Sequence, residues 1–217
     1  MQMGRWERLV PLTGVVAVAL VLAGFLVPGD TPSTHATAQK VQAFYSSHTT
    51  RVAIGAFLLA LAVPFLVFFA STLHRVVRFA GSRGRLAAAA LGGGVLSATG
   101  FAVAGAVGLA LADAGDKTAS VGATQPLHVL SEDLFIPFVA GLGVMVLATG
   151  LATVRYGGVL PRLLGWIGVV IGVAIFIPIV GFFAFALCGL WIIATSIVLF
   201  QRGSLMAEGP AVSERQM

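Results

Sequence analysis

Long apolar runs alternate with short polar segments along this chain. Five runs lack Asp, Glu, Lys, Arg and His: Leu9–Val27, Val52–Leu73, Leu86–Ala112, Leu134–Val154 and Leu163–Phe200. A helix needs about 20 apolar residues to cross the roughly 30 Å hydrocarbon core of a bilayer. Each of the first four runs therefore predicts one membrane-spanning helix.

The fifth run is about twice as long as one crossing requires. As a single straight helix it would extend roughly 57 Å at about 1.5 Å per residue. Pro178 cannot donate a backbone N–H and Gly181 tolerates turn conformations, so the run is predicted to fold back near these two residues. We therefore expect an all-α, polytopic bundle of six transmembrane helices, with a re-entrant pair as the alternative for the last run.

The polar segment between the first two runs has a helical pattern of its own. Ser33 or Thr34 is a candidate helix cap, and Val41, Phe44 and Tyr45 follow at the spacing that places them on one helix face. This pattern predicts a short amphipathic helix on the outer surface that leads into the second span. It is either a lid over an outward-open cavity or a simple connector at the lipid headgroups.

The polar segment before the fourth run also predicts a helix start. Thr124 is a candidate cap and Pro126 suits a first helical turn, so the fourth helix is expected to begin there and to stand above the hydrocarbon. His128 and Glu132 are four residues apart and would face the same way.

Charge predicts the orientation. Only 10% of the residues are charged and 58% are hydrophobic, against about 25% charged in a soluble domain. Ten of the 13 basic residues fall on one side of the predicted spans: Arg5, Arg8, Arg75, Arg78, Arg83, Arg85, Arg155, Arg162, Arg202 and Arg215. Cytoplasmic loops collect Lys and Arg, so both termini are predicted to be cytoplasmic. Residues 1–202 form the predicted six-helix domain, and 203–217 a disordered cytoplasmic tail.

The net charge of +5 does not predict a nucleic-acid partner, because the arginines are explained as loop anchors. The expected partners are the lipid bilayer and a membrane protein or a second copy of this chain. Small residues supply candidate helix-packing positions: Gly100, Ala104, Gly108, Gly168 and Gly172. Packing within the chain is the first interpretation and a homodimer face is the alternative.

The apolar runs contain no ionisable group, which argues against proton- or sodium-coupled transport. A path for an uncharged or lipid-like solute, lined by hydroxyls, is an alternative; these hydroxyls are Ser97, Thr99, Thr149, Thr195 and Ser196. Hydroxyls in membrane helices also commonly bond to their own helix. No protease motif or phosphate-binding loop is present, and Gly92–Gly94 is interpreted as a packing or flexibility site. No catalytic residue is predicted, and the cofactor is left unknown.

Acidic and histidine side chains gather in the predicted outer segments: Asp30, His35, His48, Asp113, Asp116, His128, Glu132 and Asp133. Imidazole with carboxylate suits zinc or copper, and the candidate ligands are His48, His128, Glu132 and Asp113. A haem held by His48 and His128 is a further alternative. Ordinary solvated loop residues are the simplest interpretation.

Two stretches carry a resemblance. Gly29-Asp30-Thr31-Pro32 is followed by Val41-x-x-Phe44-Tyr45-x-x-His48-x-x-Arg51, and Leu160-Pro161-Arg162-x-Leu164-Gly165-Trp166-x-Gly168 opens the fifth run. The chain resembles an uncharacterised family (a domain of unknown function) of small six-span membrane proteins from GC-rich Gram-positive bacteria. The resemblance implies a bacterial inner-membrane protein and adds no substrate.

The leading functional hypothesis is a non-enzymatic membrane protein. It binds a small ligand, a lipid or a partner protein at an outward-facing site under the first outer loop. The candidate ligand-binding residues are Tyr45, His48, Arg51, His128 and Glu132, of which the first three are spaced by three residues and could share a helix face. The alternatives are a transporter or channel for an uncharged or lipid-like solute, and a metal- or haem-dependent membrane enzyme.

Overall fold

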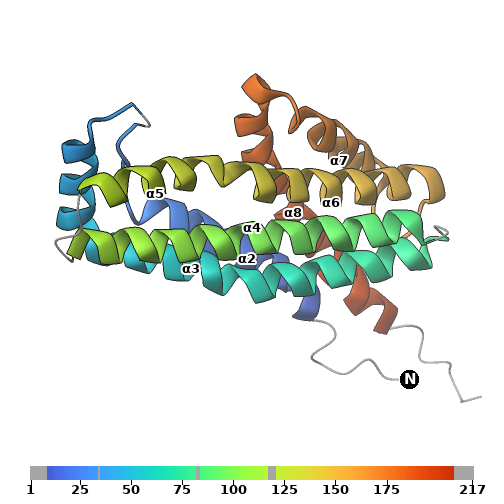
Figure 1. Ribbon diagram of the computed structural model, residues 1–217. Helices are drawn as coiled ribbons and strands as arrows, with labels where there is room; N and C mark the ends of the chain where they lie inside the picture. The colour runs from blue at the N-terminus through green and yellow to red at the C-terminus, as the bar shows by residue number, and fades with distance from the viewer. Residues whose placement is uncertain (1–8, 34, 82–83, 117–120, 208–217) are drawn as a thin grey trace, which may run out of the picture.

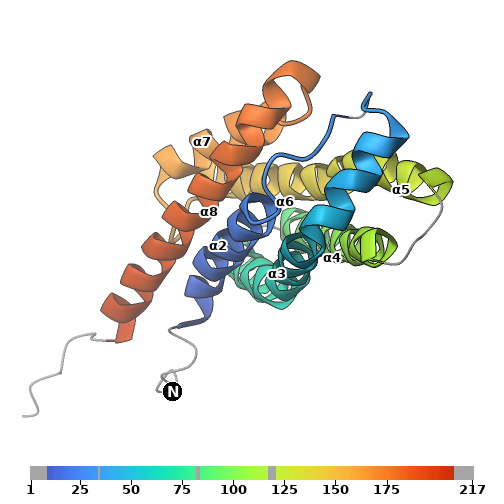
Figure 2. The same ribbon diagram turned by 90° about the vertical axis from the view of Figure 1, so that its left-hand side faces the viewer.

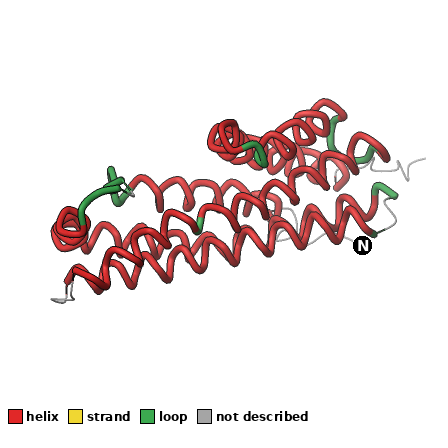
Figure 3. The backbone as a smooth tube through the Cα atoms, turned by 45° about the horizontal axis from the view of Figure 1, so that its top comes forward, coloured by secondary structure: helices red, strands yellow, loops and turns green. Residues whose placement is uncertain are grey.

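The protein is all-helical. The structure is a computed structural model and describes residues 9–33, 35–81, 84–116 and 121–207; these ranges contain no strand. The helices are η1 (Val10–Leu12), α2 (Thr13–Leu26), α3 (Ala38–Phe79), α4 (Arg85–Asp116), α5 (Val121–Asp133), α6 (Phe135–Tyr156), α7 (Arg162–Ala174) and α8 (Pro178–Ala207). Figure 3 shows helices along most of the described chain, with loops between them. The predicted all-α class is confirmed.

The helices form two layers. Helices α3, α4 and α6 lie side by side along their lengths, and α5 continues the line of α6 (Figure 1). Seen from one end, α2, α8 and α7 pack on one side of this layer, and α8 runs next to α2 (Figure 2). The main core lies between the layers and is built from residues such as Leu66, Phe69, Phe101 and Met145.

Four helical stretches are long and apolar enough to cross a membrane: Ala38–Phe79, Arg85–Gly115, Thr124–Tyr156 and Val180–Arg202. The apolar helices Val10–Leu26 and Arg162–Ala174 are shorter. Helix α7 has 13 residues, so it is about 20 Å long and falls short of a bilayer core of roughly 30 Å. In the last apolar run, α8 therefore has the length for one crossing and α7 does not.

The last apolar run turns at residues 175–177. Helix α7 ends at Ala174 and Pro178 is the first residue of α8, a position where proline is tolerated because its missing N–H would have no helical partner. Gly181 lies inside α8 and not in the turn; a Cβ there would stand 2.8 Å from the carbonyl oxygen of Ile175. The predicted break is therefore close to Pro178. Helix α8 continues to Ala207, past the predicted boundary at residue 202.

The predicted amphipathic helix is the first part of α3. We call Ala38–Ser47 the arm, and the end of the bundle where it lies the arm end. At His48 the backbone leaves helical geometry (φ −123°, ψ 18°), and the arm crosses the end of the bundle instead of continuing α3 (Figures 1 and 2). The residue before the arm is Thr37, in extended geometry and without a side-chain cap bond, so Ser33 is not the cap. Thr34 lies outside the described residues.

Glycines set the spacing between α4 and α6. A Cβ atom at Gly93 would lie 2.6 Å from the backbone nitrogen of Met145, and one at Gly141 would lie 2.4 Å from the backbone nitrogen of Ser97. The two helices therefore touch backbone to backbone. Gly94 meets Ala70 of α3, whereas Gly92 faces open space.

The candidate packing residues lie at contacts within the chain. Gly100 lies against Phe138 of α6 and Gly108 against Ala56 of α3. On α7, Gly168 meets the Trp191 ring of α8 and Gly172 meets the backbone of Leu147 of α6. Ala104, between the first two in sequence, is partly buried and lines a cavity.

Candidate ligand-binding site

Polar side chains tie the arm and the loop before it to α4 and α5. The amide nitrogen of Gln42 donates to the carbonyl of Ala114, 3.4 Å away, and the Thr124 hydroxyl donates to the Gln42 amide oxygen. The Gln125 amide nitrogen donates to the carbonyl of Ala36 at 3.3 Å. Thr124 lies inside α5, which begins at Val121, so the prediction that it caps this helix is wrong. Its side chain holds the arm instead.

His128 is the centre of this attachment and is fully buried. Its Nε2 lies 3.1 Å from the carbonyl oxygen of Pro32, and its Nδ1 lies 2.9 Å from the Tyr45 hydroxyl. A carbonyl only accepts hydrogen bonds, so Nε2 carries a proton; in the neutral ring Nδ1 then accepts from Tyr45. One imidazole thus joins the loop, the arm and α5.

The Tyr45 hydroxyl stays protonated at all physiological pH values. Tyr45 lies in the arm, outside the apolar part of α3, and only 3% of its surface is exposed. Burial raises the pKa of Tyr45 from 10.0 to about 12; the Ser131 hydroxyl lowers this pKa and the negative charge of Glu132 raises it. A neutral phenol can donate to His128, which is the role that the geometry requires.

A cavity of about 300 Å³ opens beside Tyr45 at the arm end. We call it the headgroup cavity. Its polar lining consists of Thr31, Tyr45, Ser131 and Glu132. Its apolar lining includes Phe25, Val52, Ala56, Leu59, Ala104, Leu111, Phe135 and Phe138. A cavity with one polar and one larger apolar part suits an amphiphilic molecule.

Only part of the predicted ligand-binding set lines this cavity. Tyr45 and Glu132 line it. His128 is buried and does not line it, but its Nδ1 accepts the hydrogen bond of the Tyr45 hydroxyl. His48 and Arg51 lie at the kink of α3, in a separate shallow polar hollow. The expectation that Tyr45, His48 and Arg51 share one helix face is wrong, because the helix is broken at His48.

The predicted metal ligands do not form a recognisable centre. The ring of His48 stacks on Phe44 at 4.6 Å, and its Nδ1 lies 3.0 Å from the Phe44 carbonyl oxygen. Both nitrogens of His128 have hydrogen-bond partners, while Asp113 and Glu132 are exposed. Among the residues that the structure describes, no three His, Cys, Asp or Glu side chains are grouped so as to hold a metal ion. Asp116 has no described side chain.

The hydroxyls considered for a solute path fall into two groups. Thr99 and Thr149 donate to the carbonyls of Val95 and Met145, four residues earlier in their own helices. The buried hydroxyls of Ser97, Thr195 and Ser196 have no hydrogen-bond partner among the described residues. None of the five lines the headgroup cavity, so they add nothing to this site.

Sequence reasoning missed Thr31, Ser131 and the apolar walls of the cavity. Ser131 could have been found, because it lies three residues after His128 on α5. The apolar walls carry no signal, since residues such as Val52 and Leu59 look like any other residue of a membrane span.

The fold and the site together define a class of protein: an all-helical bundle, compatible with an integral membrane protein, that has an amphipathic cavity at one end. Comparison with family models, curated proteins and solved structures finds no match. The function is therefore argued from the cavity itself.

Proposed function

We propose that this chain is a non-enzymatic protein of the bacterial cell membrane that binds a lipid-like amphiphile in the headgroup cavity. The arm end faces outward and both termini are cytoplasmic. This orientation holds for six spans and for a re-entrant α7, because the α7–α8 hairpin returns to the end opposite the arm. There the Arg202 guanidinium donates to the carbonyl of Val159, just before α7. Membership of the Gram-positive family that the sequence resembles is part of the proposal.

The observation that carries the proposal is the division of the cavity into two chemistries. The polar residues belong to the loop before the arm, the arm and α5, and the aliphatic and aromatic ones belong to α2, α3, α4 and α6. A small polar solute would leave the apolar walls unmatched, and a pure hydrocarbon would leave the carboxylate of Glu132 without a charged partner. A molecule with a polar headgroup and an apolar body matches both.

The charge in the polar lining indicates the kind of headgroup. Glu132 is exposed and makes no ion pair among the described residues, and the other polar residues of the lining, Thr31, Tyr45 and Ser131, carry neutral hydroxyls. A carboxylate among hydroxyls favours a headgroup that carries an ammonium, because a charged N–H donor forms the stronger hydrogen bond with an ionised acceptor. We therefore infer an amine-bearing lipid, of which phosphatidylethanolamine is a suitable probe.

Filling the cavity should remove the lipid. In Ala104→Phe the new ring occupies the apolar part of the cavity, whereas in Ala106→Phe the same ring lies on the exposed side of α4. Native mass spectrometry of protein purified from phosphatidylethanolamine-containing membranes measures bound lipid. We expect Ala104→Phe to lose at least about tenfold in bound lipid, or about 1.4 kcal/mol or more in binding free energy. Ala106→Phe should retain the wild-type level.

The headgroup is tested separately. Glu132→Gln should weaken the binding of phosphatidylethanolamine by about threefold, an effect typical of an exposed ion pair. It should not weaken the binding of phosphatidylglycerol, which has no amine. Asp133→Asn removes a charge at the neighbouring residue, which does not line the cavity, and should change neither. Equal lipid retention in wild type and Ala104→Phe, with both proteins folded, would refute the proposed function.

A further inference from the structure

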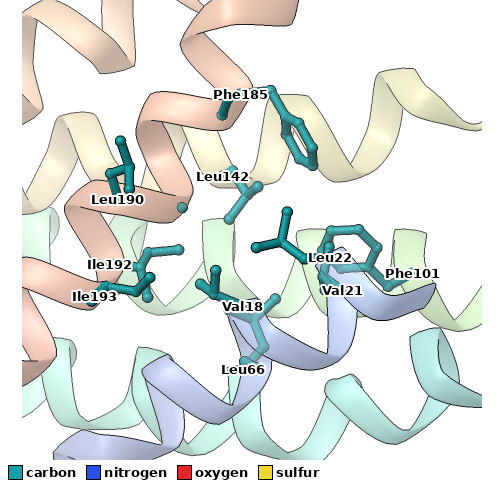
Figure 4. Close-up of a pocket in the computed structure, with 13 residues that line it drawn as sticks. Val18, Val21, Leu22, Leu66, Phe101, Leu142, Phe185, Leu190, Ile192 and Ile193 are labelled. Atoms are coloured by element: carbon teal, nitrogen blue, oxygen red, sulfur yellow. The ribbon is translucent and has the colours of Figure 1, made fainter. Parts of the chain in front are cut away.

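A second cavity, of about 290 Å³, lies between α2, α6 and α8. Its walls come from α2, α3, α4, α6 and α8, and every lining residue is apolar or glycine. Figure 4 shows Phe101 and Phe185 at one side of this cavity, with Leu190, Ile192 and Ile193 at the opposite side. We call it the apolar cavity. It offers no group for a polar ligand or for a peptide backbone, both of which need hydrogen-bond partners when buried.

Aromatic rings separate the two cavities. Phe25 and Phe138 line the headgroup cavity, and Phe101 and Phe185 line the apolar cavity. The centroid of the Phe25 ring lies 6.4 Å from that of Phe101 and 6.3 Å from that of Phe185, and Phe101 stacks on Phe138 at 4.6 Å. The cavities share no lining residue and are separated by these packed pairs of rings, which we call the aromatic layer.

One ring of the aromatic layer has room to move. Phe25 is 43% exposed, whereas Phe101 and Phe138 are buried. The Phe25 side chain can change rotamer without displacing a helix, because part of its surface has no protein neighbour. A chain that joins the headgroup cavity to the apolar cavity would therefore run past Phe25.

The apolar cavity also opens sideways. Leu22 of α2 and Leu190 of α8 line it and are 52% and 63% exposed. On a chain with membrane-capable helices, exposed leucines of this kind face lipid tails. A hydrocarbon chain can therefore pass from the bilayer into the cavity between α2 and α8 without crossing a polar surface.

We propose that the apolar cavity holds the hydrocarbon chain of the same lipid whose amine headgroup lies in the headgroup cavity, with the chain running past Phe25. This inference rests on the proposed function and extends it, since it makes the ligand a long-chain lipid that enters between α2 and α8. The occupant is an acyl chain because the lining is wholly apolar, the opening faces lipid, and the headgroup cavity lies on the other side of the aromatic layer.

Photo-crosslinking tests the path of the chain. The probe is a phosphatidylethanolamine with a diazirine at the end of one acyl chain, reconstituted with the full-length protein in nanodiscs. Labelled residues are mapped by peptide mass spectrometry. We expect labelling at Val18 and at Leu190, beside the apolar cavity. Labelling at Val170, an exposed residue of α7 that lines neither cavity, reports contact with bulk lipid and serves as the internal reference.

The test variant is Gly189→Leu, because Gly189 lines the apolar cavity and a Cβ there meets nothing closer than Val18 at 3.5 Å. The leucine then fills the cavity without forcing the helices apart. Labelling at Val18 should be lost relative to Val170. The control is Gly92→Leu, the same substitution in open space on α4, which should label as the wild type does.

The outcomes separate this inference from the proposed function. In one outcome the wild type retains lipid and Ala104→Phe loses it, but the probe does not label Val18 above the Val170 reference. This outcome would overturn the proposed path of the acyl chain and leave the proposed function standing. Labelling of Val18 that persists in Gly189→Leu would also overturn the chain path. If labelling of Val18 is unchanged in Ala104→Phe, bulk lipid fills the apolar cavity alone. This outcome would overturn the proposal that one lipid occupies both cavities.

Discussion

Gly93→Leu is expected to prevent the protein from folding, while Gly92→Leu at the neighbouring position leaves it intact. A Cβ atom at Gly93 would lie 2.6 Å from the backbone nitrogen of Met145 and 2.7 Å from the carbonyl oxygen of Gly141. Both atoms belong to the backbone of α6, so no side-chain rotation can relieve the contact. A whole leucine at this position requires α4 and α6 to move apart, at a cost of more than about 3 kcal/mol.

The contact is reciprocal, which increases the expected effect. A Cβ at Gly141 would lie 2.6 Å from the carbonyl oxygen of Gly93 and 2.4 Å from the backbone nitrogen of Ser97. Separating the helices at Gly93 would therefore expose the whole α4–α6 contact. Close approach through small residues matters in a membrane because lipid supplies no hydrophobic drive for helix association.

Size-exclusion chromatography and thermal unfolding in detergent measure this difference. Gly93→Leu should aggregate or lose most of its cooperative transition. Gly92→Leu should keep the wild-type profile, since nothing lies within 4 Å of a Cβ at Gly92. A folded, monodisperse Gly93→Leu with an unchanged melting temperature would show that α4 and α6 do not touch in this way.

His128→Ala is expected to lower the free energy of unfolding by about 2–4 kcal/mol and to release the arm. The substitution removes the hydrogen bonds to Pro32 and Tyr45, and the buried Tyr45 hydroxyl loses the Nδ1 atom to which it donates. It also creates a cavity where the fully buried imidazole stood. His48→Ala is the matched control, because His48 is partly exposed and its ring nitrogen contacts, among the described residues, only Ser47 and Phe44 of the arm itself; its effect should stay below about 1 kcal/mol.

Tyr45→Phe and the double variant separate the hydrogen bond from the packing. Tyr45→Phe keeps the ring and removes only the hydroxyl that donates to His128, so we expect a loss of about 1 kcal/mol. The losses of unfolding free energy in Tyr45→Phe and His128→Ala should be non-additive by a similar amount, because both substitutions remove the same hydrogen bond. Thermal unfolding gives the energies, and limited proteolysis between residues 28 and 37 reports the release of the loop. Fully additive losses would contradict the Tyr45–His128 bond.

The helical elements follow from the sequence because a backbone without water must satisfy its own hydrogen bonds. Runs of some 20 apolar residues without charge leave the helix as the only regular structure in a bilayer, and the helices lie where these runs do. The arm was predictable for the same kind of reason. Val41 and Tyr45 are four residues apart and are both buried on one face.

The turn that ends α7 was predicted from Pro178, whereas the kink of α3 was not predicted. The kink occurs at His48, where the sequence has no glycine or proline. It follows from the packing of the arm on α5, through Gln42 and Tyr45.

The sequence by itself determined that this is a helical protein of membrane-spanning character with a polar cluster beside its first long loop, because charge and hydrophobicity are local properties of the chain. Only the tertiary structure decided which members of that cluster meet. It buries His128, which looks like a surface ligand in the sequence, and it places Glu132 beside an apolar cavity. Burial and cavity formation depend on contacts between helices distant in sequence, and neither is encoded in any one segment.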